Sequence, residues 1–413
     1  MKQPSGLTQI IVATAIAGVA GYVILWLVPA RIGGEDYKVF AVFWAAMYLV
    51  VGALSGIQQE VTRAARPVAL PAEGAPAPRV GSARVFGLLS AGAVLALVVV
   101  SAPLWVMRVF PEEGWAMVAP LAVGTASYVL VATLSGSLYG VQAWRAVAGL
   151  IAVDALLRLV SVGVTSLVTD NLVALAWAAA LPFIVTLGVL WPGIRQVIVG
   201  KSQLDVRYGR LTWNVSRTLL ASASSAALVS GYPLLLSLTA PEAPPALLAS
   251  LFLTITLTRA PLIVVTMSLQ GYLIVRFRDE ARFRATFLSI MAALAASGVV
   301  LAVLGWLLGP AVFALLFPGE PVLDGGFFAV LVGSSVLVAA LCVSAPAVLS
   351  RGRHMSYSLG WFAAAVVTVL ALLLPLDLLT RTALSLVAGP AAGLLVNMVT
   401  LLTMSRRARM AAR

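Results

Sequence analysis

The feature that most constrains the fold of this chain is a series of long apolar stretches that recurs along its whole length. Of the 413 residues, 61% are hydrophobic and 10% are charged, whereas a soluble domain carries about 25% charged residues. A membrane-spanning helix needs about 20 mostly apolar residues. The sequence therefore predicts an all-α polytopic membrane protein with twelve transmembrane helices, at 8–29, 37–58, 85–107, 115–138, 146–168, 172–190, 215–237, 247–275, 286–308, 326–348, 357–376 and 382–404.

The distribution of Lys and Arg predicts the orientation of these helices. With the N-terminus in the cytoplasm, 20 Lys and Arg residues fall on the inner side and 4 on the outer side, which matches the enrichment of basic residues in cytoplasmic loops. We therefore expect cytoplasmic N- and C-termini and a location in the cytoplasmic membrane. Because topology accounts for the net charge of +12, the charge does not indicate nucleic acid as a partner.

A weak internal repeat predicts two parallel halves. A shift of 210 residues superimposes Ala13, Ala17, Gly21 and Tyr22 on Ala223, Ala227, Gly231 and Tyr232. Small residues at every fourth position favour close helix packing in a membrane, so we expect Leu at Gly21 or Gly231 to disturb folding or motion. The predicted organisation is an N-terminal six-helix bundle (1–190), a cytoplasmic basic linker (191–214) and a C-terminal six-helix bundle with a basic cytoplasmic tail (215–413), arranged around a central cavity.

Arg259 is the sharpest candidate for substrate binding, because it lies near the centre of a predicted span, where a charge is costly. Thr256 and Gln270 share its helical face, and Pro261 is expected to kink the helix nearby. A central cation on a kinked helix suggests an anion-binding cavity. The alternative is a buried structural arginine.

Other candidates are Asp154, the one acid in the middle of a predicted span, and Arg158, which is four residues away and so can pair with it. The pair could make a polar helix insertable, or Asp154 could titrate or bind a coupling ion. Glu60 is a further ion-coupling candidate, near an inner helix end. The remaining substrate-binding candidates are Arg63 and Arg217, near inner helix ends, and Tyr22 and Tyr232, which are either interfacial anchors or walls of the cavity.

No metal or cofactor site is predicted. The chain has a single cysteine, Cys342, and a single histidine, His354, so a metal site of the His or Cys kind is not expected. We find no phosphate-binding glycine loop, nucleophile elbow or paired carboxylates, and therefore no catalytic residues. The sequence carries no signal for an oligomeric state.

Two features resemble the polysaccharide-flippase branch of the multidrug, oligosaccharidyl-lipid and polysaccharide (MOP) exporter superfamily: twelve spans as two parallel sixes, and a turn at Ile32-Gly33 and Tyr37. That family often has Gly where Lys38 stands here. The resemblance implies two bundles that open alternately to each side of the membrane, a polyprenyl-pyrophosphate-linked sugar as substrate, and a cavity arginine at the position of Arg259. The first helix lacks the arginine of peptidoglycan-lipid flippases and the acid of cation-coupled drug exporters.

We hypothesise a lipid-linked saccharide flippase, with membrane lipid and the saccharide carrier as partners, and glycosyltransferases or polymer-assembly proteins as further ones. Either the membrane potential or an ion at Asp154 would drive it. The first alternative is an exporter of small amphipathic cations, which should have a cavity rich in acids. Two others are a membrane enzyme acting on polyprenyl-phosphate sugars, which needs acid–base groups near the membrane face, and a scaffold that does not transport.

Overall fold

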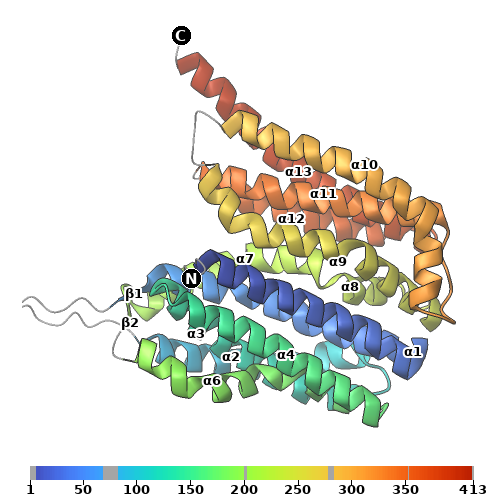
Figure 1. The fold of residues 1–413 in the computed structure, drawn as a ribbon, viewed down its shortest axis with the longest axis horizontal. Helices are drawn as coiled ribbons and strands as arrows, with labels where there is room; N and C mark the ends of the chain where they lie inside the picture. Colours follow the sequence, from blue (N-terminus) through green and yellow to red (C-terminus); the bar gives the residue numbers. More distant parts are fainter. Residues whose placement is uncertain (1–5, 68–81, 200–201, 278–282, 352, 412–413) are drawn as a thin grey trace, which may run out of the picture. The chain divides into compact units, whose positions relative to one another are not determined.

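The structure, a computed structural model, describes residues 6–67, 82–199, 202–277, 283–351 and 353–411, which are almost entirely helical (Figure 1). Its elements are α1 (Gly6–Ala64), β1 (Ala65–Pro67), α2 (Ala83–Val109), η1 (Gly114–Met117), α3 (Val118–Gly140), α4 (Trp144–Val168), α5 (Leu172–Ala180), α6 (Pro182–Ile198), β2 (Ser202–Leu204), α7 (Tyr208–Val229), α8 (Tyr232–Thr239), α9 (Pro245–Arg276), α10 (Phe283–Leu316), α11 (Gly325–Ser350), α12 (His354–Leu372) and α13 (Leu378–Ala411). They form two compact units, 1–226 and 227–413.

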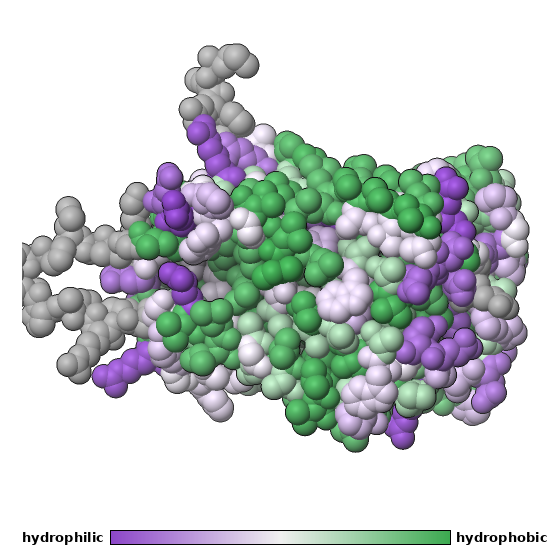
Figure 2. Space-filling model, turned by 90° about the horizontal axis from the view of Figure 1, so that it is seen from below, coloured by the Kyte–Doolittle hydropathy of each residue, from purple (hydrophilic) through white to green (hydrophobic). Residues whose placement is uncertain are grey.

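Length and composition identify a multi-pass membrane protein. Among the described residues, 10 helices are long and apolar enough to cross a membrane, and 11 if the bent pair α7–α8 forms one span. Hydrophobic residues cover the long sides of the helices in Figure 2, while hydrophilic residues gather near the helix ends. The all-α membrane class is confirmed; the count of twelve and the cytoplasmic placement of the termini stay predictions.

Gly33 divides α1 into two apolar arms, Thr8–Gly33 and Asp36–Ala64. Its φ of 77° is a left-handed value that glycine adopts without steric cost. A Cβ at this position would meet no described atom within 4 Å, so backbone conformation rather than space favours glycine here. Tyr37, four residues later, is 1% exposed and is a large anchor at the start of the second arm.

In the first unit, α3 and the second arm of α1 form the interior. Most residues in the apolar segments of these two spans are buried: 72% in the span Gly114–Gly140, which contains α3, and 61% in the second arm of α1. The helix α3 packs against α1, α2, α5 and α6, and α1 also packs against α4. Small residues allow this approach, since a Cβ at Gly136 would come within 2.8 Å of the Gln58 carbonyl oxygen on α1.

The repeated glycine stripe does not have the packing role that the sequence suggested for Gly21. A Cβ added to Gly21 would meet no described atom within 4 Å. The buried face of this arm instead carries Ala13, Ala20 and Ile24, at helical spacing. Gly21 thus has no close neighbour among the described residues, because it lies beside the packed face, and the expected effect of Leu at Gly21 or Gly231 on folding or motion stays a prediction.

Two strands join loops that are distant in the sequence. β1 pairs antiparallel with β2, with Ala65 opposite Leu204. Nearby, the backbone N–H of Ser82 donates to the Tyr208 hydroxyl at 2.7 Å. Both loops were expected on the cytoplasmic side, and the pairing shows that they lie on the same side, as the four candidate spans between them require. We call this arrangement, β1–β2 with Ser82 and Tyr208, the loop clamp.

In the second unit, α11 is the central helix and packs against α9, α10, α12 and α13. It is buried along most of its length. The helix α10 approaches it through glycines: a Cβ at Gly298 would lie 2.9 Å from Val336, and one at Gly309 would lie 2.6 Å from Phe328. Because the other face of α10 is exposed and apolar, it suits contact with lipid.

The predicted helix at 215–237 is broken in the structure. The helix α7 ends at Val229, and α8 starts at Tyr232 after a bend of 73°. Pro233 explains the break, because proline lacks an N–H and its ring clashes with the carbonyl four residues earlier, here that of Val229. Tyr22, the counterpart of Tyr232 in the repeat, is followed by Val23 and lies inside a continuous helix. The two copies of the repeat therefore have different backbones at this point.

Candidate functional site

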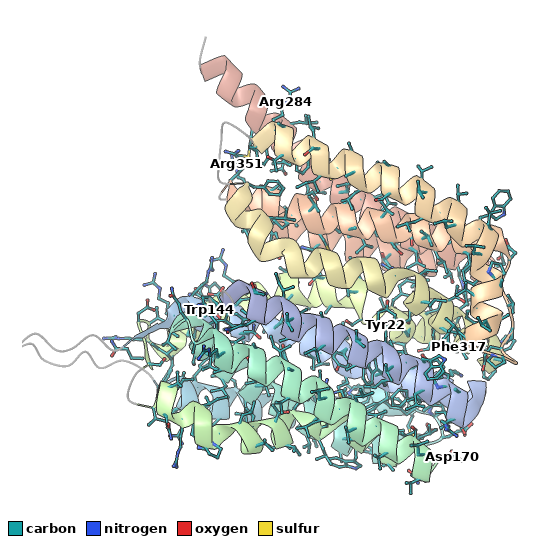
Figure 3. All side chains as sticks on the ribbon, viewed as in Figure 1. Tyr22, Trp144, Asp170, Arg284, Phe317 and Arg351 are labelled. Atoms are coloured by element: carbon teal, nitrogen blue, oxygen red, sulfur yellow. The ribbon has the colours of Figure 1, made fainter. Side chains whose placement is uncertain are left out.

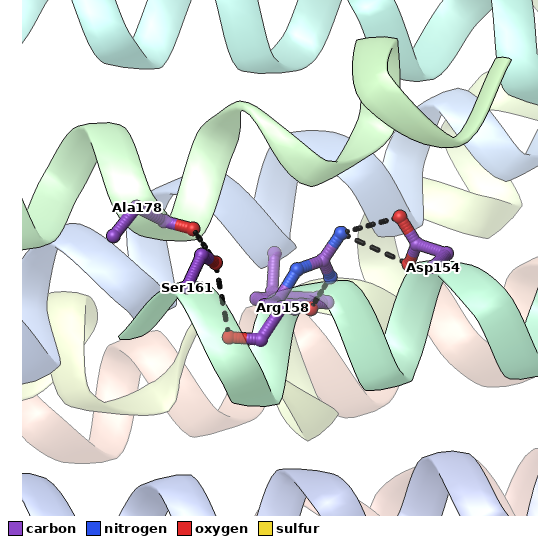
Figure 4. Close-up of polar contacts among 5 residues, drawn as sticks. Asp154, Arg158, Ser161 and Ala178 are labelled. Carbon is purple, nitrogen blue, oxygen red and sulfur yellow. Dashed lines mark hydrogen bonds and ion pairs between the residues drawn. The ribbon is translucent and has the colours of Figure 1, made fainter. Parts of the chain in front are cut away.

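The first unit buries an ion pair in the middle of α4. Helical spacing places Asp154 and Arg158 one turn apart, and the Arg158 Nη2 group donates to both carboxylate oxygens of Asp154 at 2.9 Å (Figure 4). The Arg158 side chain is 5% exposed and that of Asp154 is 17% exposed. The pairing that the spacing predicts is therefore present, and the two charges cancel within the membrane.

Aromatic side chains from other helices complete the surroundings of Arg158. Its Nη1 group donates to the Tyr48 hydroxyl on α1, and its guanidinium lies 4.1 Å from the centre of the Phe183 ring on α6. Tyr128 on α3 packs edge-on against Phe183, with 5.3 Å between the ring centres. On the same helix as the arginine, the Ser161 hydroxyl donates to the Ala178 carbonyl of α5 at 2.6 Å, which fixes α4 against its neighbour (Figure 4).

The second unit buries Arg259 without an ionic partner among the described residues. This side chain lies on α9 and is 3% exposed. Its Nε and Nη2 atoms are buried and have no hydrogen-bond acceptor in the described part of the chain. Insertion scales place the cost of a central arginine at about 2.5 to 3.5 kcal/mol, and an unpaired one lacks the partner that offsets this cost. These buried donors on a cation are suited to an anionic ligand.

Tyr232 is the nearest aromatic neighbour of this arginine. The Arg259 guanidinium carbon lies 5.8 Å from the centre of the Tyr232 ring, within the range of a cation–π contact. The ring is 1% exposed. Its hydroxyl oxygen lies 2.6 Å from the Ser385 hydroxyl oxygen and 3.3 Å from the Thr382 carbonyl oxygen. Contacts from α9 and α13 therefore fix the first residue of α8.

Glu60 forms a third polar contact, at the end of α1. Its carboxylate accepts hydrogen bonds from the Thr218 hydroxyl at 2.7 Å and from Arg63 at 3.1 Å. Glu60 is buried, but the Arg63 side chain is 64% exposed. Arg217, next to Thr218 on α7, is also exposed. Arg63 and Arg217 thus lie on the surface of the first unit rather than in its interior.

The remaining candidates are not brought together. Tyr22 is half-buried, and its hydroxyl has no hydrogen-bond partner among the described residues. Gln270 belongs to α9, but its side chain lies outside the described part of the structure. The side chain of His354 is outside it as well. In the described residues there is no group of three His, Cys, Asp or Glu side chains that could hold a metal ion.

Figure 3 shows where the polar ends of the helices lie within each unit. Trp144 and Asp170 mark opposite ends of α4, while Arg284 of α10 and Arg351 of α11 occupy the same end of the second unit. The guanidinium of Arg351 lies 4.2 Å from the Phe283 ring centre. This contact joins two loops that were expected on one side of the membrane.

Sequence reasoning missed the side chains that surround the two arginines. Tyr48 and Phe183 around Arg158 come from distant spans, and so do Ser385 and Thr382 around Tyr232. None of these stands at an informative spacing from its arginine. Pro233 was a readable signal for the break in α7–α8, since proline inside a predicted helix marks a possible break.

No protein-family model matches the chain. Two mycobacterial proteins, however, are similar to it in sequence over nearly its whole length. The uncharacterized protein Mb3654 of Mycobacterium bovis is 34% identical over 390 residues, which are 94% of this chain and 90% of that protein. The uncharacterized protein Rv1510 of Mycobacterium tuberculosis is 32% identical over 392 residues, with the same shares of the two chains.

Solved structures resemble the fold over nearly the whole chain. The lipid II flippase MurJ in an inward closed conformation matches with a TM-score of 0.67 and 11% identity, over 95% of this chain and 87% of MurJ. An inward-facing multidrug resistance transporter of the MATE family, within the MOP superfamily, matches with a TM-score of 0.64 and 14% identity, over 95% of both chains. At these identities the likeness shows the fold alone. A nearly all-helical fold like those of MATE transporters and MurJ is confirmed, whereas twelve helices in two six-helix bundles stay a prediction.

Proposed function

We propose that this protein is an alternating-access flippase for a lipid-linked saccharide. The chain belongs to the family of the mycobacterial proteins Mb3654 and Rv1510. Its fold, which is that of MOP superfamily transporters and flippases, supports the proposal. The proposed substrate has a polyprenyl-pyrophosphate carrier, and the proposed location is the cytoplasmic membrane. The product would serve the assembly of a cell-surface polysaccharide. No covalent chemistry is part of this proposal.

The proposal is carried by the buried guanidinium of Arg259, whose Nε and Nη2 have no acceptor among the described residues. Nε and Nη2 lie on one edge of the planar group and together form a bidentate donor pair, which matches the oxygens of a phosphate. A diphosphate also supplies the negative charge that the described neighbours of this arginine lack. Exposed Arg63 and Arg217 are proposed to attract the headgroup at the cytoplasmic face, with Gln270 and Tyr22 contributing further along its path.

The fold likeness to a MATE transporter favours a second candidate, an exporter of small amphipathic cations. Such a substrate needs an available negative charge, and Asp154 is the acid placed to supply one. However, its carboxylate is already neutralised by Arg158 at 2.9 Å. The arrangement therefore supports an anionic substrate better than a cationic one.

The energy source is proposed to be either the membrane potential or an ion bound at Asp154. The Asp154 side chain is 17% exposed, more than that of Arg158, so it is the more accessible member of the pair. Protonation of Asp154 would remove the counter-charge of Arg158 and change the charge of the cluster by one unit. Glu60, which pairs with exposed Arg63, is the second coupling candidate.

The test is a flipping assay with the purified full-length protein in liposomes. A fluorescent polyprenyl-pyrophosphate-linked sugar is placed in one leaflet, and its arrival in the other is followed by accessibility to a membrane-impermeant quencher. We expect Arg259→Ala to slow flipping about 100-fold and Arg259→Lys about tenfold, because Lys keeps the charge but not the bidentate fork. Arg108→Ala, which removes an exposed arginine from α2, is the control.

The outcomes separate the proposals. If Arg259→Ala and Arg259→Lys flip the lipid-linked sugar at the rate of the unmodified protein, Arg259 is not the headgroup site. If the unmodified protein flips no lipid-linked sugar but exports amphipathic cations from loaded liposomes, the second candidate replaces the first.

A further inference from the structure

We infer that Tyr232 is the positioning residue of the proposed anion site: its ring holds the Arg259 guanidinium while leaving the Nε and Nη2 donors for the ligand. This inference rests on the proposed function, because it assigns a role to a neighbour of the arginine that would bind the diphosphate. Tyr232 acts through Arg259 and is not itself assigned a contact with the substrate.

The contact with Tyr232 occupies none of the hydrogen-bond donors of Arg259. A cation–π contact uses the electrostatic attraction of an aromatic face and consumes none of the N–H donors. The Tyr232 ring centre lies 5.8 Å from the guanidinium carbon, while Nε and Nη2 remain without an acceptor in the described residues. Tyr232 therefore stabilises the positive charge in an apolar setting and leaves the bidentate edge available.

Arg158 provides the contrast within the same molecule. It too lies against an aromatic face, with 4.1 Å from its guanidinium carbon to the Phe183 ring centre. Yet Nη2 is bound to Asp154 and Nη1 to Tyr48. An aromatic support is thus common to both buried arginines. Among the described residues, Arg158 has an ionic partner and leaves only its Nε without an acceptor, whereas Arg259 has no ionic partner and leaves both Nε and Nη2 without one.

Hydrogen bonds at its hydroxyl group fix the Tyr232 ring in place. The Ser385 hydroxyl donates to the Thr382 carbonyl at 2.8 Å, so the Tyr232 hydroxyl, 2.6 Å from the Ser385 oxygen, donates to Ser385. The Thr368 hydroxyl of α12 in turn donates to the Ser385 carbonyl at 3.3 Å. We call Tyr232, Ser385, Thr382 and Thr368 the hydroxyl chain; it ties the ring to α12 and α13.

The backbone position of Tyr232 depends on the break between α7 and α8. Pro233 ends α7 at Val229 and makes Tyr232 the first residue of α8. A bend of 73° separates the two helices, so Tyr232 lies on the axis of α8 and not on that of α7. The matching Tyr22 lacks this break, and its hydroxyl has no described partner. The positioning role therefore belongs to the second copy of the repeat alone.

The experiment measures binding of farnesyl diphosphate to the purified full-length protein in detergent by titration calorimetry. Tyr232→Phe keeps the ring and loses the hydroxyl, and we expect its affinity to stay within about threefold of the unmodified protein. Tyr232→Leu loses the ring, and we expect binding about tenfold weaker. Inorganic pyrophosphate and farnesol, tested in parallel, distinguish a free diphosphate from a lipid-linked one and show that the anion is required.

A variant of unchanged shape separates positioning from simple structural support. Tyr232→3,4,5-trifluorophenylalanine has nearly the size of Tyr232→Phe but a weaker negative potential on its face. We expect it to bind farnesyl diphosphate several-fold more weakly than Tyr232→Phe at an equal Tm. This comparison remains valid if Tyr232→Leu does not fold.

Three results overturn the inference. One is equal affinity of the Phe and trifluorophenylalanine variants. Another is that Tyr232→Phe and Ser385→Ala lose as much affinity for farnesyl diphosphate as Tyr232→Leu does. That result would mean that Tyr232 has a structural role in the hydroxyl chain. In both cases Arg259→Ala still abolishes binding, and the proposed function stands. The third is unchanged binding in Arg259→Ala, which removes the anion site itself and the inference with it.

Discussion

Among the described residues, each unit buries one arginine in the middle of a long helix, and the two differ in their ionic partners. Arg158 in the first unit is bound to Asp154 and Tyr48, and only its Nε lacks an acceptor. Arg259 in the second unit has the face of Tyr232, and its Nε and Nη2 have no acceptor among the described residues. A buried charge in a membrane needs either a partner in the protein or a reason to lack one. Burial of a charge alone therefore does not point to a binding site, whereas the lack of an ionic partner among the described residues is the reason to propose one at Arg259.

The largest expected effect breaks the paired side of this comparison. Arg158→Met leaves the Asp154 carboxylate without its counter-charge inside the membrane, and we expect the free energy of unfolding to fall by about 3 kcal/mol, the low end for a broken buried pair because Asp154 is partly exposed. Resistance to unfolding by SDS measures this change. The matched control, Arg158→Met combined with Asp154→Asn, should recover most of the loss, since no unpaired charge remains.

The double variant also tests ion coupling. If it is stable and flips lipid-linked sugar at the normal rate, an ion at Asp154 is not the energy source. If it is stable and inactive while a membrane potential is imposed, the coupling role of Asp154 gains support.

The same substitution in the second unit should act in the opposite direction. Arg259→Met removes a buried charge that has no described counter-charge and replaces it with an apolar side chain of similar length, so we expect unfolding to become harder by about 1 to 2 kcal/mol. Flipping should be lost at the same time. A fall in stability comparable to that of Arg158→Met would show that Arg259 is a structural residue.

A smaller effect is expected at the helix end, where water can reach one partner. Glu60→Gln weakens the bond from the Thr218 hydroxyl and removes the attraction to Arg63, and we expect a loss of about 1 kcal/mol in the SDS assay. Arg63→Gln should cost less than about 0.5 kcal/mol, because the Arg63 side chain is 64% exposed and its ion pair is screened. Equal losses would mean that the exposed ion pair, and not the buried hydrogen bond, contributes the stability.

The smallest effect is expected for a carboxylate outside the membrane. The pKa of Asp377 lies below its usual range, because its carboxylate accepts the backbone N–H of Thr380 at 2.9 Å. Its stabilising contribution is therefore complete above the ordinary aspartate pKa and is lost as pH falls through the lowered value. The difference in Tm between the unmodified protein and Asp377→Asn should change slightly below about pH 4. A difference that is constant across this range would contradict the prediction.

The sequence predicted what depends on local spacing. The pairing of Asp154 with Arg158 follows from their four-residue separation, and the central position of Arg259 follows from the length of its span. The open state of Arg259 could not be predicted, since it depends on which side chains α8 and α13 bring near it. Gly21 shows the converse, because a small residue at helical spacing indicates packing only if a neighbour happens to face it.

The break between α7 and α8 shows the limit of the internal repeat as a guide to structure. Pro233 was visible in the sequence, but the repeat with Tyr22 suggested equivalent continuous helices. One residue after the shared Gly-Tyr, Val23 and Pro233 give the two copies different backbones. A weak repeat thus predicts the arrangement of helices better than the conformation of any one position.

The loop clamp sets an order of events during synthesis of the protein. β1 leaves the ribosome first and has no partner until β2 follows, after the four candidate spans between them have been made. Bringing the two ends of so long a loop together costs less entropy once the intervening helices have placed them close to each other. We therefore expect strand pairing to follow insertion of these four spans, so that Ser202–Leu204 joins the end of the segment they form to its beginning.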